Sequence, residues 1–407
     1  MEEWKEVRLD SLVNRKICYG IVQPGFSPKN GIPVIKVNNV VKGLRDVSEC
    51  DKTTEEISNS YKRTILKGGE LIISLVGTVG CVDIAPSSFA GANLVRATGM
   101  IDIEDELIKH WVLYYIRTRQ GQQYIEENLN TTVQRALNIK DLCKMPIPIT
   151  SKHYMGRIVS ILKSLDDKIE VNRRINDNLE QQAQALFKSW FVDFEPFKNG
   201  EFVESELGMI PKGWRVGTFL DNIKVMPGGT PSTSRSEYWD DGTIPFFSPK
   251  DVNGVYCFET EKSITELGLN NCSSNLYPKD TLFITARGTV GKLTLAGVPM
   301  AMNQSNYALV AREGVGKYYL YLITQTLVSV LLKKANGAVF SAITTRDFNE
   351  PTLMPTHNDL KNFELLVTPI FKKIFQTSVE SRRLADLRDT LLPKLMSGEL
   401  KVNEIEI

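Results

Sequence analysis

The chain has 407 residues, of which 42% are hydrophobic, so it is long enough for two or three domains with buried cores. Its net charge of +1 excludes a nucleic-acid binder that relies on overall positive charge, and contacts with phosphates must come from local patches. The six cysteines include no Cys-x-x-Cys pair and the three histidines have no plausible second ligand, which argues against a metal site. We find no apolar leader and no uninterrupted membrane-spanning run, and we expect a cytoplasmic protein with reduced thiols and no membrane partner.

In chain order, the sequence presents one plan twice. The matching segments are WKEVRLDSLV from Trp4 and WRVGTFLDNI from Trp214, GIPVIKVNNVVKG at 31–43 and GTIPFFSPKDVNG at 242–254, Gly-Thr-Val-Gly at 77–80 and at 288–291, and WVLYYI from Trp111 and YYLYLI from Tyr318. A repeat of this length is too long for a solenoid unit, so it indicates two whole domains.

Each half mixes strands and helices. The apolar runs at 70–76 and 281–286 predict strands, and each enters a Gly-Thr-Val-Gly turn whose glycines adopt positive φ. Amphipathic helices are predicted at 105–128 and 316–334. Each half is therefore expected to be a strand-rich domain with helices packed on it.

A long helix is predicted from Ile158 to Trp190. Its apolar positions alternate steps of four and three residues, which is the period of a coiled-coil seam. A second seam follows about 205 residues further on, where Thr-Pro at 368–369 predicts the N-cap and first helical residue of part of the rod, and Pro393 predicts a kink or an end. The two rods are expected to pair in antiparallel fashion. The predicted seam residues are Ile158, Leu162, Leu165, Ile169, Asn172, Asn176, Leu179, Leu186, Ile370, Ile374, Thr377, Ser381, Leu384 and Leu391.

The middle of each seam is polar. Asn172 and Asn176 in the first helix have Thr377 and Ser381 as their counterparts in the second. An antiparallel pair would bring these polar layers together, where a buried polar layer costs stability and fixes register. The alternative is that these side chains face solvent at a bend.

The resulting fold class is α+β, with two tandem mixed α/β domains related by a pseudo-twofold axis and separated by two long helices in an antiparallel coiled coil. The predicted segments are a first domain at 1–150, a central helix at 151–200, a second domain at 201–357, and a carboxyl-terminal helix with its tail at 358–407. A loop-like connector at 191–213 leads into the second half.

Motifs for catalysis are missing from the sequence. Gly288 to Lys292 lacks the spacing of a phosphate-binding loop, and no nucleophile elbow, zinc-protease motif, dinucleotide fingerprint or adenine-methyltransferase tetrapeptide occurs. We therefore expect a chain without catalytic residues, metal or cofactor of its own.

Two domains held apart by rigid spacers suit a two-part target on a repeating polymer such as DNA, whose helical turn of about 34–36 Å is comparable with the roughly 50 Å rod. Arginine reads guanine, and asparagine or glutamine reads adenine, whereas lysine and threonine more often contact phosphate. The alternative for each residue is an ordinary exposed loop side chain. The candidate DNA-binding residues are Lys36, Asn38, Asn39, Thr78, Gln134, Arg135, Ser248, Lys250, Asn253, Arg287, Thr289, Gln304 and Asn306.

Several long stretches carry a family resemblance. They are YGIVQPG at 19–25, LDDKIEVNRRINDNLEQQAQALFKSWFVDFEPF at 165–197, LGMIPKGWRV at 207–216, GGTPSTSRSEYWDDGTIPFFSPKDV at 228–252 and LRDTLLPKLMSGEL at 387–400. With them the chain resembles the specificity (S) subunit of bacterial type I restriction–modification systems. The segments before the two long helices lack the proline- and glutamine-rich entry of that family.

The resemblance implies a function as well as a fold. Each half would be a target-recognition domain for one part of a split, asymmetric double-stranded DNA sequence, and the helices would set the gap and dock two methyltransferase subunits. Restriction–translocase subunits would join for cleavage. S-adenosylmethionine, Mg²⁺ and ATP would then be held only by the partner subunits. The alternatives are a self-contained restriction–methylation enzyme or a fragment of one, and a tandem-domain adaptor that binds no DNA.

Overall fold

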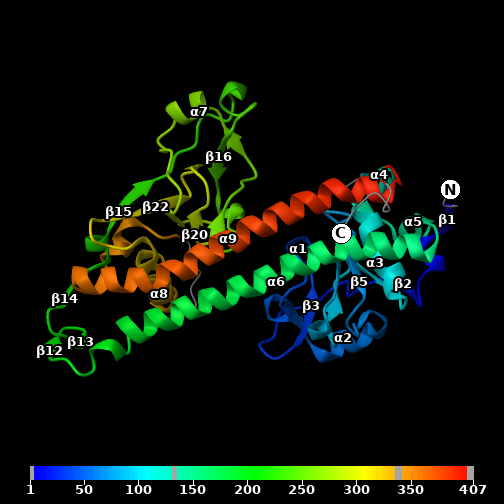
Figure 1. Cartoon of the computed structure of the whole chain (residues 1–407). Coiled ribbons are helices and arrows are strands. Elements are labelled where there is room, and N and C mark those ends of the chain that lie inside the picture. Colours follow the sequence, from blue (N-terminus) through cyan, green and yellow to red (C-terminus); the bar gives the residue numbers. More distant parts are fainter. Residues whose placement is uncertain (1–3, 131–134, 335–341, 401–407) are drawn as a thin grey trace. The chain divides into compact units, whose positions relative to one another are not determined.

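The computed structural model describes residues 4–130, 135–334 and 342–400. The chain divides into two compact units, one formed by residues 1–168 with 383–407 and the other by residues 169–382. Two helices of 40 residues each, α6 (Lys152–Phe191) and α9 (His357–Met396), contribute a segment to both units (Figure 1).

The first unit combines a four-stranded antiparallel sheet, in the order β2-β8-β5-β6, with a three-stranded sheet, β4-β3-β7, in which β3 and β7 run parallel. Two short pairs, β1 with β11 and β9 with β10, complete it. Its elements are β1 (Lys5–Arg8), β2 (Arg15–Tyr19), β3 (Ile32–Ile35), α1 (Val37–Lys42), β4 (Asp51–Thr53), α2 (Glu55–Ser60), β5 (Leu71–Ser74), β6 (Val82–Ile84), β7 (Asn93–Leu94), β8 (Thr98–Asp102), α3 (Glu106–Arg117), α4 (Arg119–Glu127), β9 (Leu129–Asn130), β10 (Ala136–Leu137), α5 (Ile139–Cys143) and β11 (Pro146–Ile149).

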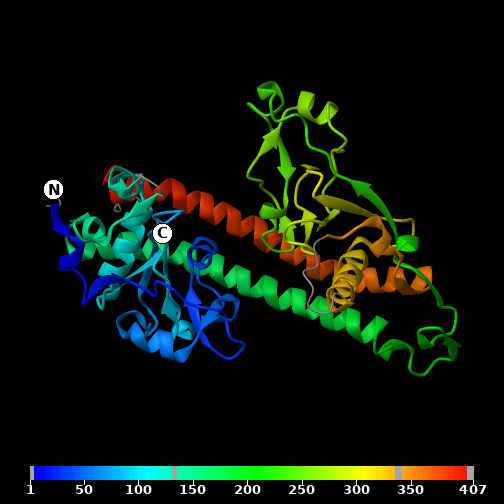
Figure 2. The same cartoon turned by 180° about the vertical axis from the view of Figure 1, so that it is seen from behind.

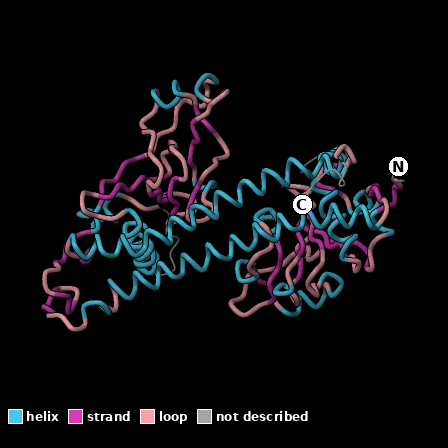
Figure 3. Tube along the Cα trace, viewed as in Figure 1, coloured by secondary structure: helices cyan, strands magenta, loops and turns pink. Residues whose placement is uncertain are grey.

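The second unit repeats this plan. A five-stranded sheet in the order β15-β22-β19-β20-β17 lies with a three-stranded sheet, β18-β16-β21, whose β16 and β21 are parallel. Its elements are β12 (Phe202–Ser205), β13 (Gly208–Pro211), β14 (Arg215–Thr218), β15 (Ile223–Pro227), β16 (Ile244–Phe247), β17 (Tyr256–Cys257), β18 (Ser263–Ile264), α7 (Glu266–Asn270), β19 (Leu282–Thr285), β20 (Leu293–Ala296), β21 (Ala301–Met302), β22 (Asn306–Ala311), α8 (Lys317–Lys334) and β23 (Pro351–Met354). Figure 3 shows the same mixture of helices and strands in both units. The predicted α+β class and internal repeat are therefore confirmed.

Local signals explain the helix that each unit packs on its sheet. Asp105 accepts hydrogen bonds from the amides of Leu107 and Ile108 and so caps α3. The predicted helix at 105–128 is divided at Thr118, which accepts a bond from Gly121 and starts α4. The predicted helix at 316–334 is α8, which begins at Lys317.

The helix faces complete the two cores. In the first unit Ile158, Leu162 and Leu395 are buried together with Trp111 and Tyr114 of α3. In the second unit the core includes Phe187 and Phe191 of α6, Phe363 and Phe371 of α9, and Tyr319 of α8. Each unit therefore folds around the two long helices and not merely beside them.

Within each unit α6 and α9 run antiparallel (Figure 2). In the first unit Arg388 forms an ion pair with Asp166 over 2.6 Å. In the second unit Asn176 donates to Ser378 over 3.1 Å and accepts from Thr377. All fourteen predicted seam residues are buried or half-buried in their units.

The polar layer is inside the helix pair. Asn172 is fully buried and donates to the Glu380 carboxylate over 2.9 Å, whereas its Oδ1 has no hydrogen-bond partner among the described residues. The alternative in which these side chains face solvent is wrong for Asn172. Its partner is Glu380, which is next to the predicted seam residue Ser381 in the sequence.

Two expectations from proline are wrong. The second long helix runs from His357 to Met396 as one element, so no part of it starts at Pro369 and it does not end at Pro393. Both prolines are exposed, so a carbonyl group that loses its helical partner there can bond to water.

The connector at 191–213 is more ordered than predicted. It contains the β12–β13 hairpin, and Phe194 and Phe197 pack against Trp214 with ring centroids 5.6 and 5.1 Å apart. The four predicted segment boundaries stay a prediction.

Asn172→Leu should stabilise the chain by about 1–2 kcal/mol, because it removes a buried carbonyl oxygen that lacks a partner and extends the apolar seam. The midpoint of urea unfolding, followed by circular dichroism, measures the change. A loss of stability would contradict a polar layer that is retained for register.

Candidate nucleic-acid interface

Parallel strand pairs place polar residues side by side in each unit. The amide of Val95 donates to the carbonyl of Ile35 over 3.2 Å, so Lys36 and Arg96 follow neighbouring strand ends. In the second unit Asn303 donates to Phe247 over 2.9 Å, which brings Ser248 near Gln304.

The Gly-Thr-Val-Gly turns lie next to these strand ends. Gly77 and Gly288 each have φ of 80°, a conformation that favours glycine, as the sequence predicts. Leu75 donates to Ala97 over 2.8 Å, and its counterpart Ala286 donates to Ser305 over 2.8 Å. The exposed Thr78 and Thr289 at the turn tips are thereby held beside the corner that follows β7 or β21.

A third segment completes each arrangement. Gly77 donates to the carbonyl of Arg135 over 3.0 Å, and Ile343 donates to Ala286 over 2.9 Å. The structure thus gathers two sets of exposed or half-exposed polar residues. We call Lys36, Thr78, Arg96 and Arg135 the first polar edge, and Ser248, Arg287, Thr289 and Gln304 the second polar edge.

The side chain of Asn39 stabilises the start of α1. Its Oδ1 accepts the amide of Lys36 over 2.8 Å, which caps α1. Asp251 does the same at the equivalent position, where it accepts the amide of Ser248 over 2.7 Å and the Ser248 hydroxyl over 2.7 Å. The cap therefore fixes the backbone at the start of each edge.

Several predicted cations already have an acidic neighbour. Lys36 is paired with Asp51, and Arg135 with Glu126. Lys250 is paired with Glu261 over 3.3 Å. Exposed pairs of this kind contribute little to stability, so a phosphate group can displace the carboxylate.

The remaining candidates differ in accessibility. Asn306 is only 1% exposed and donates to Asn303, so its predicted contact with DNA is wrong for this folded surface. Asn38 and Asn253 are exposed, and Gln304 accepts a hydrogen bond from the Thr230 hydroxyl. Gln134 lies outside the described residues.

The sequence alone did not single out Arg96. It follows a strand of only two residues, β7, whose parallel pairing with β3 places it beside Lys36. The internal repeat could have identified it, since an alignment of β7 with β21 makes Arg96 equivalent to Gln304, which is one of the candidates.

A tyrosine on the helix that packs on each sheet, α3 or α8, anchors that helix to α6. The Tyr114 hydroxyl on α3 donates to Asp166 over 2.9 Å, and the equivalent Tyr321 hydroxyl on α8 donates to Glu180 over 3.0 Å. Gln325 donates to the same Glu180 oxygen over 2.8 Å. Burial, together with the adjacent carboxylate, raises the pKa of both tyrosines, so they remain donors at neutral pH.

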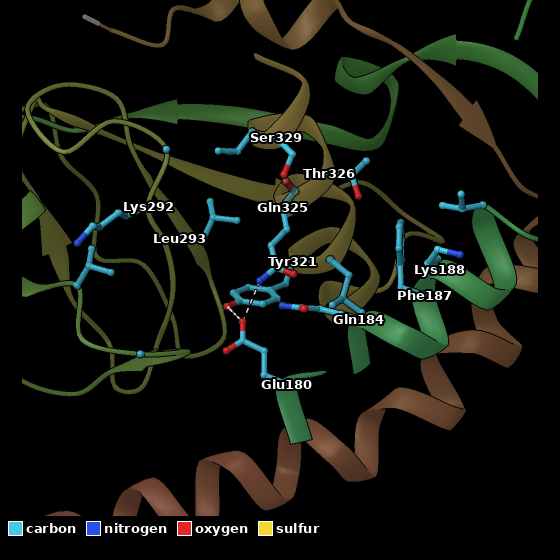
Figure 4. Close-up of a pocket in the computed structure, with 16 residues that line it drawn as sticks. Glu180, Gln184, Phe187, Lys188, Lys292, Leu293, Tyr321, Gln325, Thr326 and Ser329 are labelled. Atoms are coloured by element: carbon cyan, nitrogen blue, oxygen red, sulfur yellow. Dashed lines mark hydrogen bonds between the residues drawn. The ribbon is translucent and has the colours of Figure 1, made fainter. Parts of the chain in front are cut away.

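The anchor in the second unit lies in a groove of about 740 Å³ between α6, α8 and the turn that ends at Lys292 (Figure 4). Phe187 and Leu293 line its apolar part, and the Glu180 carboxylate accepts from the Tyr321 hydroxyl inside it. Because its carboxylate is used by this anchor, we read the groove as part of the scaffold.

Among the described residues, no group of three or more histidine, cysteine, aspartate or glutamate side chains could hold a metal ion. None of the helices in those ranges has both the length and the apolar character that are needed to cross a bilayer.

A family model described as the type I restriction modification DNA specificity domain matches residues 1–181 and 211–354. The chain belongs to this family. Relatives of the chain include the type I restriction enzyme MjaIX specificity subunit of Methanocaldococcus jannaschii, which is 29% identical over 90% of the chain and 84% of the relative. The HindI specificity subunit of Haemophilus influenzae is 26% identical over 98% of the chain and the whole of the relative.

A solved structure has a similar fold. The S subunit of a type I restriction–modification system from M. genitalium aligns over 97% of this chain and 96% of its own, with a TM-score of 0.50 and 15% identity. The family and its named members confirm the principal prediction, a non-catalytic specificity subunit, and do not support the two alternatives.

Gly77→Ala should weaken use of the first polar edge, because alanine at φ of 80° costs about 1–2 kcal/mol and displaces Thr78. Gly91→Ala is the matched control, since Gly91 has φ of 87° and equally open surroundings but precedes β7 at the opposite end. Both variants should lose similar stability in thermal unfolding. Only Gly77→Ala should reduce sequence-specific DNA binding, and equal effects on binding would contradict the assignment of the edge.

Proposed function

We propose that each polar edge reads one half of a bipartite, asymmetric DNA target and that the paired long helices set the gap between the halves. One observation carries this proposal: the same edge is built twice with different side chains at equivalent positions. Lys36 and Arg96 of the first edge correspond to Ser248 and Gln304 of the second. A shared backbone with exchanged side chains suits two readers of different sequences.

The chemistry of the edges supports a division of labour. Thr78 and Thr289 at the turn tips suit phosphate contacts, which fix position without reading sequence. Arginine and amide side chains beside them suit base edges in the major groove. The net charge of +1 means that affinity depends on these few local contacts.

The partners complete the reaction. We propose that two methyltransferase subunits dock on the long helices and carry S-adenosylmethionine, while restriction–translocase subunits use ATP and Mg²⁺. The chain would act in the cytoplasm, where these subunits meet DNA. Leu365 and Leu366 of α9 support docking there, since they are 65% and 50% exposed and adjacent.

A methylation assay tests the function. The chain is mixed with its methyltransferase subunit and randomised DNA, and methylated adenines are mapped by sequencing. We expect a split motif that requires both proteins. Methylation by this chain alone, or a motif that is unchanged without it, would overturn the proposal.

Deletion of one heptad from both helices, residues 170–176 and 377–383, should shorten the tolerated gap by about 10 Å, or about three base pairs. These segments face each other in the helix pair, and their removal leaves the apolar period intact. The same sequencing assay reports the gap. A changed half-sequence with an unchanged gap would refute the spacer role.

Leu365→Lys combined with Leu366→Lys should weaken recovery of the methyltransferase subunit by at least about tenfold, because charge on a buried contact is strongly unfavourable. Leu267→Lys on α7 is the control, since Leu267 is 51% exposed but is not on a long helix. Copurification measures both. Equal recovery of the partner with the double variant and with the control would show that docking uses another surface.

A further inference from the structure

The two edges differ by the position of an arginine. Strand pairing makes Arg96 equivalent to Gln304, since β7 pairs with β3 as β21 pairs with β16. The bridges Val76–Ala136 and Arg287–Ala342 make Val76 equivalent to Arg287. The first unit therefore has arginine where the second has glutamine, and valine where the second has arginine.

The backbone at these positions is held on several sides. Arg96 donates its amide to Ile21 over 2.7 Å, and its neighbour Val95 donates to Ile35. Arg287 donates its amide to Ser305 over 3.2 Å and forms its bridge with Ala342. Because the backbone at these positions is already fixed, little backbone entropy is lost when the side chain binds DNA.

These two arginines have uncommitted side chains. Both are exposed, and within the described part of the chain neither guanidinium has an ion pair or a hydrogen bond. By contrast, Lys36 and Arg135 beside Arg96 have carboxylate partners. Gln304 beside Arg287 already accepts a hydrogen bond from the Thr230 hydroxyl at its Oε1.

We infer that Arg96 and Arg287 are specificity-determining residues, each of which donates two hydrogen bonds to a guanine in the major groove of its own half-target. This inference rests on the proposed function and adds which base is read in each half and which residue reads it. Since the arginines occupy different positions on equivalent edges, the guanine lies at a different place in each half. The geometry of the guanidinium fork matches the O6 and N7 acceptors of guanine.

The test uses the full chain with its methyltransferase subunit on randomised DNA, with methylated sites read by sequencing. Arg96→Gln should lower discrimination at one guanine position of the first half-sequence by about tenfold to a hundredfold. The second half-sequence and the gap should not change. Arg287→Gln should have the reciprocal effect on the second half alone.

Lys67→Gln is the control for loss of positive charge. Lys67 is exposed and precedes β5, at the end of that strand opposite the edge. It should leave both half-sequences unchanged. Thermal unfolding of each variant, expected to match the parent chain because the sites are exposed, excludes misfolding as the cause.

Two outcomes would overturn the inference. Uniformly weaker methylation of all sites by Arg96→Gln, with an unchanged motif, would mean that Arg96 contacts phosphate. An unchanged motif and rate would mean that Arg96 does not contact DNA. Either outcome leaves the proposed function standing as long as the parent chain yields a split motif, whereas a parent without one would refute that function first.

Discussion

The antiparallel pairing of α6 with α9 is the constraint on which both units depend. Each unit buries faces of the two helices in its own core, and one tyrosine hydroxyl ties α3 or α8 to α6. A hydrogen bond to a charged carboxylate, such as Tyr114 to Asp166 or Tyr321 to Glu180, contributes about 1.5–3 kcal/mol. The edge and the long helices are therefore parts of one folded body within each unit, which is what a gap-setting helix requires.

A chain with a net charge of +1 can bind a polyanion such as DNA only if its positive side chains are placed where they contact it. At the first edge the carboxylates of Asp51 and Glu126 hold two of the cations, whereas Arg96 has no ion pair with any residue that the structure describes. Non-specific attraction stays weak under this arrangement, because each exposed ion pair must be exchanged before a phosphate binds. In the proposed function, specificity then comes from the few side chains that contact base edges.

The sequence predicts those parts of the fold that depend on local sequence patterns. The seam from Ile158 onward, the positive φ of Gly77 and Gly288, and the repeat of strand and helix all depend on near neighbours in the chain. The helix start at Pro369 is wrong because packing of Phe363, Val367 and Phe371 in the core continues the helix across an exposed proline. Tertiary burial here overrides the local preference of proline.

The site itself could be predicted only in part. Thr78, Arg287 and Thr289 lie on the edges, whereas Asn306 points inward and Asn39 is used as a cap. The position of Arg96 depends on the parallel pairing of β3 with β7, which involves only two residues of each strand. The two strands are distant in the sequence, and no periodic pattern predicts that they pair. Which loops meet at an edge is decided by sheet topology, and that information is spread over the whole half.

The central claim is that the two edges contact opposite halves of one target. A photocrosslinking residue at Thr78, and separately at Thr289, tests it directly in the assembled complex on a defined duplex. We predict that position 78 labels only one half-sequence and position 289 only the other. Labelling of the same half from both positions, or of neither, would contradict the account.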